Sequence, residues 1–133
     1  HLLSRRQRQD VYKRQVRWAF YGGQYDTIEE FMKAVQEYHE ELDADGWQPE
    51  EVVLACKEVT VQYAYWDEEE ETEEDFRLTA DGDGFTAGEL LFKIHNRVVG
   101  HLENEDHHFF EGLSLYKDAA PENRPFYFLG LGS

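Results

Sequence analysis

The sequence has little of what stabilises or anchors a protein apart from a hydrophobic core. It contains one cysteine, Cys56, so no disulfide can form within the chain, and a reducing compartment would suit it. No hydrophobic run approaches the roughly 20 residues that a membrane-spanning helix requires, and we expect no secretory signal. A chain of 133 residues can bury a core without such supports, so the composition predicts one cytoplasmic domain.

Basic residues are also scarce. The sequence has 13 Lys and Arg against 29 Asp and Glu, a formal net charge of −16. A surface this acidic repels phosphates and anionic headgroups, so we expect neither nucleic acid nor a membrane surface as a partner. It attracts basic proteins and cations; the alternative is that the acidity serves only solubility.

The first 15 residues differ from the rest. Residues 10–15, DVYKRQ, are similar to the translation of a transposase sequencing adapter, and residues 1–9 show no amphipathic or strand pattern. We expect residues 1–15 to be read-through outside the fold and residues 16–133 to form a single domain; the alternative is a disordered basic arm. Residues 1–15 hold five basic residues and one acidic residue, which leaves the rest with eight basic and 28 acidic residues, a net charge of −20.

Two stretches carry the signals of helices. Thr27 with Glu30 and Thr86 with Glu89 have the spacing of capping boxes, in which the hydroxyl accepts from a first-turn amide and the carboxylate reaches back. Apolar residues then recur at spacings of three and four, as on one face of a helix. These stripes are Ile28, Phe31, Val35, Tyr38 and Leu42, and Leu91, Ile94, Val98 and Leu102. We expect the first helix to end at Gly46 and the second near Asn104.

Alternating apolar residues predict strands over 16–21, 52–66, 76–80, 107–116 and 125–131. The longest is apolar on both sides as far as Cys56, as in a buried central strand, although Pro49 would also suit the start of a helix there. In 107–116 we expect Phe109 and Leu113 on one face, with a bulge permitted at Gly112. Residues 67–75, of which eight of nine are acidic, are expected to form the solvated tip of a hairpin.

The expected order is therefore β-α-β-β-α-β-β. Two helices that each have one apolar face must cover one face of an antiparallel or mixed sheet, so the sequence predicts an α+β fold, a two-layer sandwich. The two β-α-β segments also permit a ferredoxin-like arrangement, with the last strand added in a hairpin at an edge.

Residues 81–89, DGDGFTAGE, resemble part of a calcium-binding EF-hand loop at first sight. The register fails, because the twelfth loop position falls on Leu90 instead of a glutamate, and a strand precedes the loop where an EF-hand has a helix. We expect a turn in which the Asp-Gly pairs supply positive φ angles and Thr86 starts the helix.

Histidine and acidic residues between 95 and 111 form a second candidate for a metal or catalytic site. They lack any established metal-ligand spacing, and the adjacent His107 and His108 point to opposite faces of the expected strand. Cys56 and His95 lie in or beside apolar stripes, so we expect both to be structural. We expect no metal, no cofactor and no catalytic residue. The cluster comprises His95, His101, Glu103, Glu105, Asp106, His107, His108 and Glu111.

In size, acidity, aromatic content of 15% and α+β order, the chain resembles the immunity proteins that bacteria keep against their own toxins. The resemblance rests on these shared features and on no defining motif. It implies a non-enzymatic protein that binds a basic protein such as a toxin domain, with carboxylates for steering and aromatic anchors at the centre of the contact. The alternative is a small enzyme or cation-binding domain that uses the 95–111 cluster. The expected contact residues are Tyr63, Tyr65, Trp66, Asp67, Glu68, Glu69, Glu70 and Glu71.

Overall fold

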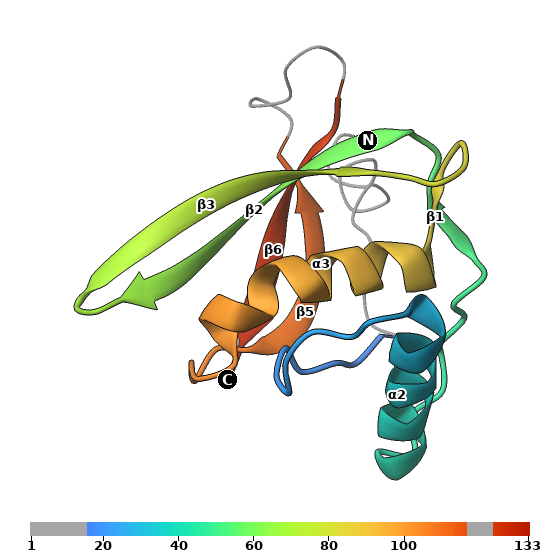
Figure 1. Cartoon of the computed structure of the whole chain (residues 1–133), viewed down its shortest axis with the longest axis horizontal. Helices are drawn as coiled ribbons and strands as arrows, with labels where there is room; N and C mark the ends of the chain where they lie inside the picture. Colours follow the sequence, from blue (N-terminus) through green and yellow to red (C-terminus); the bar gives the residue numbers. More distant parts are fainter. Residues whose placement is uncertain (1–15, 117–123) are drawn as a thin grey trace, which may run out of the picture.

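The computed structural model of the chain describes residues 16–116 and 124–133, so the adapter-like segment and most of the expected loop 118–124 lie outside the described residues. The described part has the expected α+β class, and its elements follow roughly the expected order (Figure 1). The elements are α2 (Ile28–Glu41), β1 (Val52–Leu54), β2 (Glu58–Asp67), β3 (Glu70–Thr79), β4 (Phe85–Thr86), α3 (Ala87–Leu102), β5 (Phe109–Leu115) and β6 (Phe126–Gly132).

The main sheet has four strands in the order β3-β2-β6-β5. It consists of two antiparallel hairpins, β2–β3 and β5–β6, which are joined by a short parallel contact between β2 and β6. Helix α3 crosses one face of this sheet, which we call the inner face, and α2 packs beside α3 (Figure 1). The sheet and α3 form two layers, as the apolar stripe of α3 predicted, whereas α2 packs on α3 (Figure 1).

The strand order is not ferredoxin-like. In that fold the first strand lies inside the sheet, whereas residues 16–21 form only one isolated bridge, from Ala19 to Phe109 at the end of β5. Phe20 N–H donates to His108 O at 2.8 Å, and Phe110 N–H donates to Trp18 O at 2.9 Å. The last strand, β6, lies between β2 and β5 and not at an edge.

The expected long strand 52–66 is two strands in two different sheets. β1 pairs with the two-residue strand β4, whereas β2 begins at Glu58 and belongs to the main sheet. Val52 is 61% exposed, so β1 is not the buried central strand that its apolar composition predicted. The apolar residue that β1 does bury is Leu54, which joins the core beside the start of α3.

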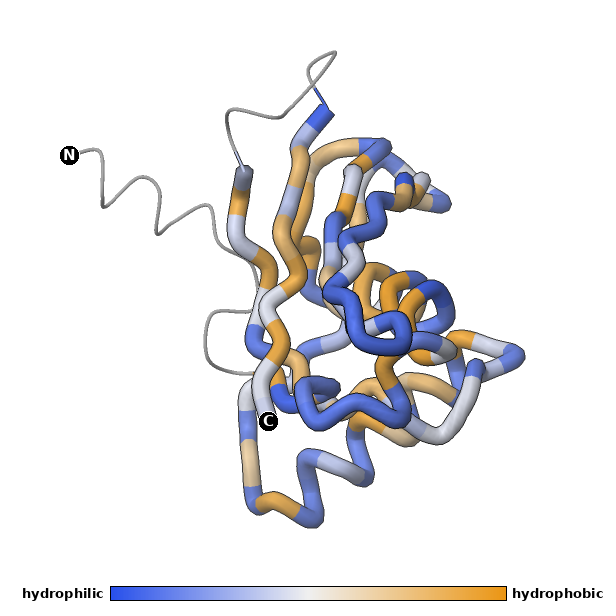
Figure 2. The backbone as a smooth tube through the Cα atoms, turned by 90° about the vertical axis from the view of Figure 1, so that its left-hand side faces the viewer, coloured by the Kyte–Doolittle hydropathy of each residue, from blue (hydrophilic) through white to orange (hydrophobic). Residues whose placement is uncertain are grey.

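The core lies between α3 and the inner face of the main sheet. Val59, Val61 and Tyr63 alternate inward from β2 as predicted, and they meet buried residues of α3 such as Ile94 and Val98. Burying each aliphatic side chain of this kind contributes about 1.5–3 kcal/mol. Figure 2 shows the hydrophobic segments concentrated in the strands and α3, while the end of the β2–β3 hairpin is hydrophilic.

Both helices begin where the sequence predicted. The Thr27 and Thr86 hydroxyls accept from the N–H groups of Glu30 and Glu89, at 3.2 Å in each case. α3 ends at Leu102, close to the expected position. α2 ends at Glu41 instead of Gly46, because Asp43 already takes a left-handed conformation with φ 53°.

The bulge expected in the fifth strand is present. The β5–β6 register shifts between Phe110 and Leu113, and Gly112 within the shift has φ 110°. Because the bulge adds one residue, Phe110 and Leu113 both turn into the core, and Phe109 remains at the surface. The expected shared face for Phe109 and Leu113 is therefore wrong. No helix in residues 16–116 and 124–133 is long and apolar enough to cross a membrane.

Candidate functional site

The acidic block lies on a strand and not in a loop. β2 continues to Asp67 and β3 begins at Glu70, so only Glu68 and Glu69 form the turn between them. The ladder pairs Asp67 with Glu70 and Trp66 with Glu71. The expected solvated tip is thus much shorter than 67–75, and most of the carboxylates stand on the edge strand β3.

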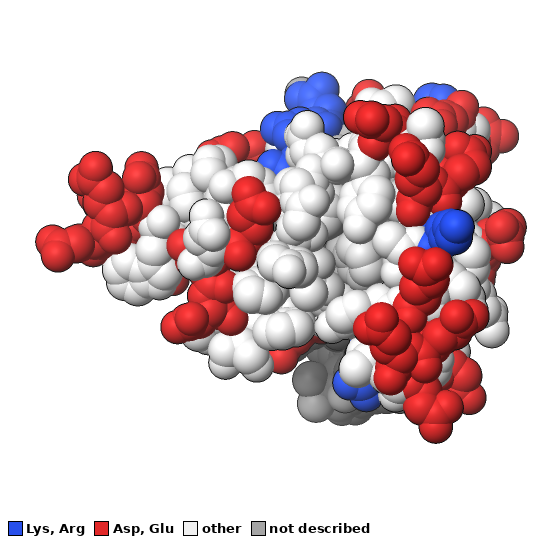
Figure 3. Space-filling model, turned by 60° about the horizontal axis from the view of Figure 1, so that its bottom comes forward, with Lys and Arg blue, Asp and Glu red and all other residues white. Residues whose placement is uncertain are grey.

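The carboxylates at this end of the hairpin are exposed to solvent. Residues 67–71 are all exposed, and Figure 3 shows them as a projecting acidic end of the molecule. Residues 62–75 contain no Lys or Arg that would neutralise them. The ion pairs described in the structure join Lys93 to Asp81 and Glu89, and Arg124 to Glu58. Like charges opposite each other on paired strands are destabilising, so Asp67 and Glu70 weaken the hairpin that displays them.

Tyr63 cannot serve as a surface anchor, because it is only 1% exposed. Its hydroxyl lies 2.5 Å from Nδ1 of His101, and its ring packs edge-on against Phe76. Burial raises the pKa of the Tyr63 hydroxyl. Tyr63 therefore supports the hairpin from the inner face of the sheet.

Tyr65 and Trp66 have different degrees of exposure. Tyr65 is half-buried, with its ring stacked on His101 at a centroid distance of 3.9 Å and an interplanar angle of 6°. Its hydroxyl donates to Glu74 Oε2 at 3.0 Å, and this hydrogen bond raises the pKa of Tyr65. Trp66 points the other way and is 57% exposed, so it is the aromatic residue of this hairpin end that is available to a partner. We call Tyr65, Trp66 and residues 67–71 the hairpin surface.

A second acidic surface covers α2. Carboxylates on the exposed side of this helix lie at the opposite end of the molecule from the hairpin, with a broad uncharged area between the two (Figure 3). The sequence singled out residues 67–75 by their acidic density, whereas the carboxylates of α2 are spread along the helix and form a surface only in the fold. Only the hairpin surface combines the carboxylates with an exposed tryptophan. The exposed acidic residues of α2 are Glu29, Glu30, Glu37, Glu40 and Glu41.

The residues of the 95–111 cluster are directed to separate places. His95 is buried, where its Nδ1 accepts from Trp18 Nε1 at 3.0 Å and its Nε2 donates to Gly23 O at 2.7 Å. His101 packs on Tyr65, and His108 Nδ1 contacts the backbone oxygen of Glu105. In the described part of the chain, no three His, Cys, Asp or Glu residues come together in a way that would hold a metal ion.

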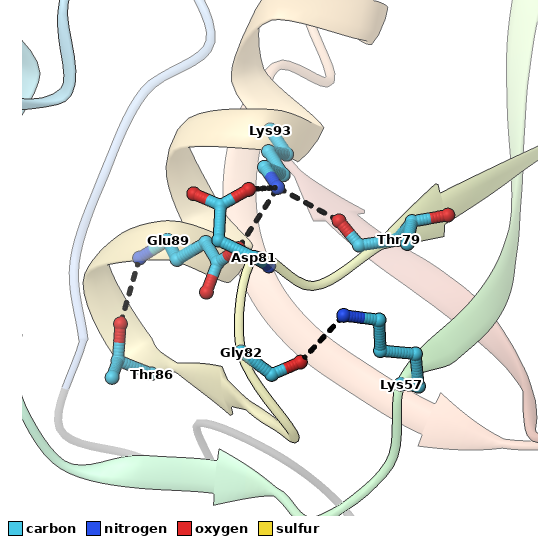
Figure 4. A network of polar contacts seen from close by, with 7 residues as sticks. All are labelled: Lys57, Thr79, Asp81, Gly82, Thr86, Glu89 and Lys93. Atoms are coloured by element: carbon cyan, nitrogen blue, oxygen red, sulfur yellow. Dashed lines mark hydrogen bonds and ion pairs between the residues drawn. The ribbon is translucent and has the colours of Figure 1, made fainter.

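The turn 81–84 is held by a lysine. Lys93 donates to Glu89 Oε2 at 2.8 Å, to Asp81 Oδ1 at 3.1 Å and to Thr79 O at 2.7 Å (Figure 4). Glu89 also accepts from the Asp81 N–H at 2.7 Å, so its carboxylate binds the turn and not the cap amide that a capping box predicted. Although partial burial lowers the pKa of Lys93, its hydrogen bonds to Glu89 and Asp81 raise it overall. The ammonium group thus takes the place between the carboxylates that a bound cation would need.

Cys56 is half-buried, and burial raises the pKa of its thiol. A raised pKa keeps the thiol protonated at neutral pH, whereas a nucleophile requires the thiolate. This agrees with the structural role expected for Cys56.

Sequence reasoning missed a cavity of about 300 Å³ beside the hairpin surface. It opens where the parallel ladder of β2 and β6 ends, at Gln62 and Phe128. Glu105 reaches this place from the turn after α3, and its carboxylate accepts from the Trp66 N–H at 3.3 and 3.4 Å. The pairing of β2 with β6 is non-local, so no sequence signal pointed to it. The lining residues are Ala64, Tyr65, Trp66, Glu71, Glu105, His107, Phe128, Leu129 and Leu131.

Comparison of the chain with known protein families, with characterised proteins and with solved structures gave no match.

Proposed function

We propose that this chain is an acidic binding protein that recognises a basic protein through the hairpin surface. We further propose that the partner is a bacterial toxin domain, whose basic cleft the hairpin end blocks in the cytoplasm. The observation that carries the proposal is the exposed carboxylates of residues 67–71, which stand beside the exposed ring of Trp66 without a basic residue between 62 and 75.

Electrostatics accounts for how such a surface would find its partner. The net charge of −20 on residues 16–133 attracts a basic protein over distances of about a Debye length, roughly 10 Å at 0.1 M salt. Charges of this kind mainly speed association, while a desolvated aromatic anchor mainly slows dissociation. The long hairpin places both at one projecting end of the molecule (Figure 1).

The like-charge pair Asp67–Glu70 supports a functional role for the acidity. If the charges served only solubility, they would be expected at positions where they do not oppose strand pairing. Natural proteins retain locally unfavourable residues mainly at functional sites.

The test uses the product of a toxin-like gene that neighbours the gene for this chain. Surface-plasmon kinetics would compare Glu68→Gln/Glu69→Gln/Glu70→Gln with Glu37→Gln/Glu40→Gln/Glu41→Gln, which removes the same charge from α2. We expect the hairpin variant to slow association severalfold more than the α2 variant, and to flatten its dependence on salt. Trp66→Ala should raise the dissociation rate, while Leu42→Ala, at an exposed apolar residue directly after the end of α2, should not.

Cell survival tests the toxin part of the proposal separately. Cells that express the neighbouring toxin-like protein should survive when this chain is co-expressed, and the hairpin variant should protect them less than the α2 variant. Equal kinetics for the two charge variants would overturn the hairpin surface. Binding without protection, or a genome without a toxin-like neighbour, would overturn the immunity role.

A further inference from the structure

The cavity between β2 and β6 combines three kinds of lining. Phe128, Leu129 and Leu131 form an apolar wall, and Trp66, which is largely exposed, also lines the cavity. Two acidic residues, Glu71 and Glu105, line it as well, and the remaining lining residues, Ala64, Tyr65 and His107, add no Lys or Arg. The cavity takes residues from both faces of the sheet because it lies in the space between two strands beyond their last pair.

The carboxylates are held in different ways. Glu105 is fixed by the hydrogen bond from the Trp66 N–H, a donor that points toward β6 because the hydrogen-bonding directions of successive strand residues alternate. Glu71 lies directly opposite Trp66 in the β2–β3 ladder, so its side chain shares the face of the Trp66 ring. The two acids therefore lie on either side of one residue, Glu105 at the backbone N–H of Trp66 and Glu71 beside its side chain, and they come from separate elements.

We propose that this cavity binds the side chain of an arginine from the basic protein, an inference that rests on the proposed function. The guanidinium group is planar and weakly hydrated, stacks on aromatic rings and pairs with carboxylates through two parallel hydrogen bonds. Its methylene stem suits the apolar wall. A volume of about 300 Å³ is at the lower end for ligand sites, which fits one side chain and not a large cofactor.

A titration of the whole chain alone tests this without the partner. The probe is the peptide acetyl-Gly-Arg-Gly-amide, and the control is the same peptide with citrulline, which has the shape of arginine without its charge. The chain has three tryptophans, so the indole N–H signal of Trp66 can be assigned in NMR spectra as the one missing in Trp66→Phe. We expect this signal to shift and saturate with the arginine peptide, at least fivefold more tightly than with citrulline. An equal response to both, or tighter binding of the same peptide with lysine in place of arginine, would overturn the proposal.

Matched variants separate the cavity from general acidity. Glu71→Gln and Glu105→Gln should each weaken binding of the arginine peptide at least threefold, since each removes one carboxylate and keeps a hydrogen-bond acceptor. Glu73→Gln is the control, because Glu73 lies on the same strand and face but does not line the cavity. Thermal melts verify that the three variants fold. Equal affinities for all three would show that the peptide senses only net charge, which would contradict the proposal.

Kinetics with the protein partner then distinguish the two proposals. If salt-dependent binding is lost in the triple hairpin variant while Glu71→Gln dissociates no faster than Glu73→Gln, the hairpin function stands and the arginine cavity is wrong. If the arginine peptide binds with the expected pattern but no basic protein does, the cavity stands and the proposed function is wrong.

Discussion

His95 has a protonation state that its surroundings define. The indole of Trp18 can only donate, so Nδ1 of His95 must accept, and the proton on Nε2 is donated to Gly23 O. Burial lowers the pKa of His95, because the charged ring would lose its hydration inside the core. His39 is buried too, with its Nε2 accepting from the Arg17 N–H, and burial also lowers its pKa.

The lowered pKa of His95 predicts a loss of stability at mildly acidic pH. Below about pH 6.5 the unfolded chain binds a proton at this residue and the folded chain does not, so the free energy of unfolding falls as pH decreases. The slope for one such group approaches about 1.4 kcal/mol per pH unit. Urea unfolding at pH 7.5, 6.5 and 5.5 gives the free energy of unfolding at each pH. This free energy should depend less on pH in His95→Gln than in the parent, and His39 should account for part of the pH dependence that remains in the variant. Equal slopes for the variant and the parent would contradict the lowered pKa of His95.

Two glycines should respond oppositely to the addition of one methyl group. A Cβ at Gly84 would lie 2.6 Å from the backbone oxygen of Leu54, whereas a Cβ at Gly100, on the exposed side of α3, would meet nothing within 4 Å. Gly84→Ala should therefore cost about 1–3 kcal/mol, and Gly100→Ala should stabilise the helix by roughly 0.5–1 kcal/mol. Thermal melts followed by circular dichroism measure both. A neutral Gly84→Ala would show that β1 can move away from the turn.

At the scale of elements, the hairpin explains why an acidic run can form a strand. Because like charges repel, the sequence predicts a solvated hairpin tip over residues 67–75. β3 is an edge strand, however, so its carboxylates reach solvent even while its backbone pairs with β2. The aromatic residues of β2 supply the pairing surface, and charges on an edge strand also oppose aggregation.

The Asp67–Glu70 pair predicts a trade between stability and binding. Glu70→Lys places opposite charges across the ladder and should stabilise the protein by about 0.2–1 kcal/mol. The same change removes negative charge from the hairpin surface, so association with a basic partner should slow. Glu69→Lys is the control, because it changes the charge equally in the turn, where Glu69 has no ladder partner. Thermal melts measure the stability and surface-plasmon kinetics the association rate. Equal stabilisation by Glu69→Lys and Glu70→Lys would contradict the argument.

Local signals in the sequence predicted features that depend on neighbouring residues, but they did not predict which distant strands pair. The capping threonines and the alternation over Val59, Val61 and Tyr63 each depend on neighbours within a few residues, and all are observed. The separation of β1 from β2 depends on β4, about 30 residues away, which no local pattern reveals.

The candidate site was predictable in composition but not in geometry. The sequence places aromatic and acidic residues side by side, and alternation puts Tyr63 and Trp66 on opposite faces of the strand, but only the structure shows that the face of Tyr63 is buried under α3 and so withdrawn from a partner. Glu105 accepts from the Trp66 N–H only because the turn after α3 lies beside the end of the β2–β6 ladder. This position depends on the arrangement of the whole sheet and has no local signal in the sequence.

At the scale of the whole molecule, charge and topology act against each other. The net charge of −16 favours expansion of the chain. Against this repulsion, the sheet joins two hairpins that are distant in sequence, and they meet only through the short parallel contact between β2 and β6. Stability must therefore come mainly from the shared core beneath α3, to which both hairpins contribute buried residues.

This opposition predicts that salt affects folding and binding in opposite directions. Raising NaCl from 0.01 to 0.15 M shortens the Debye length from about 30 to about 8 Å, which screens repulsion among the carboxylates. The melting temperature should rise by a few degrees over this range, although the ion pairs of Lys93 weaken slightly, because acidic residues far outnumber basic ones. Association with a basic partner should slow over the same range, since the same screening removes the steering field.

The α2 variant Glu37→Gln/Glu40→Gln/Glu41→Gln separates the two effects. Its melting temperature should depend less on salt than the parent's, while its association rate should remain salt-dependent. A melting temperature that falls with salt would mean that the few ion pairs outweigh the net repulsion, and the acidity would then carry no cost to the fold.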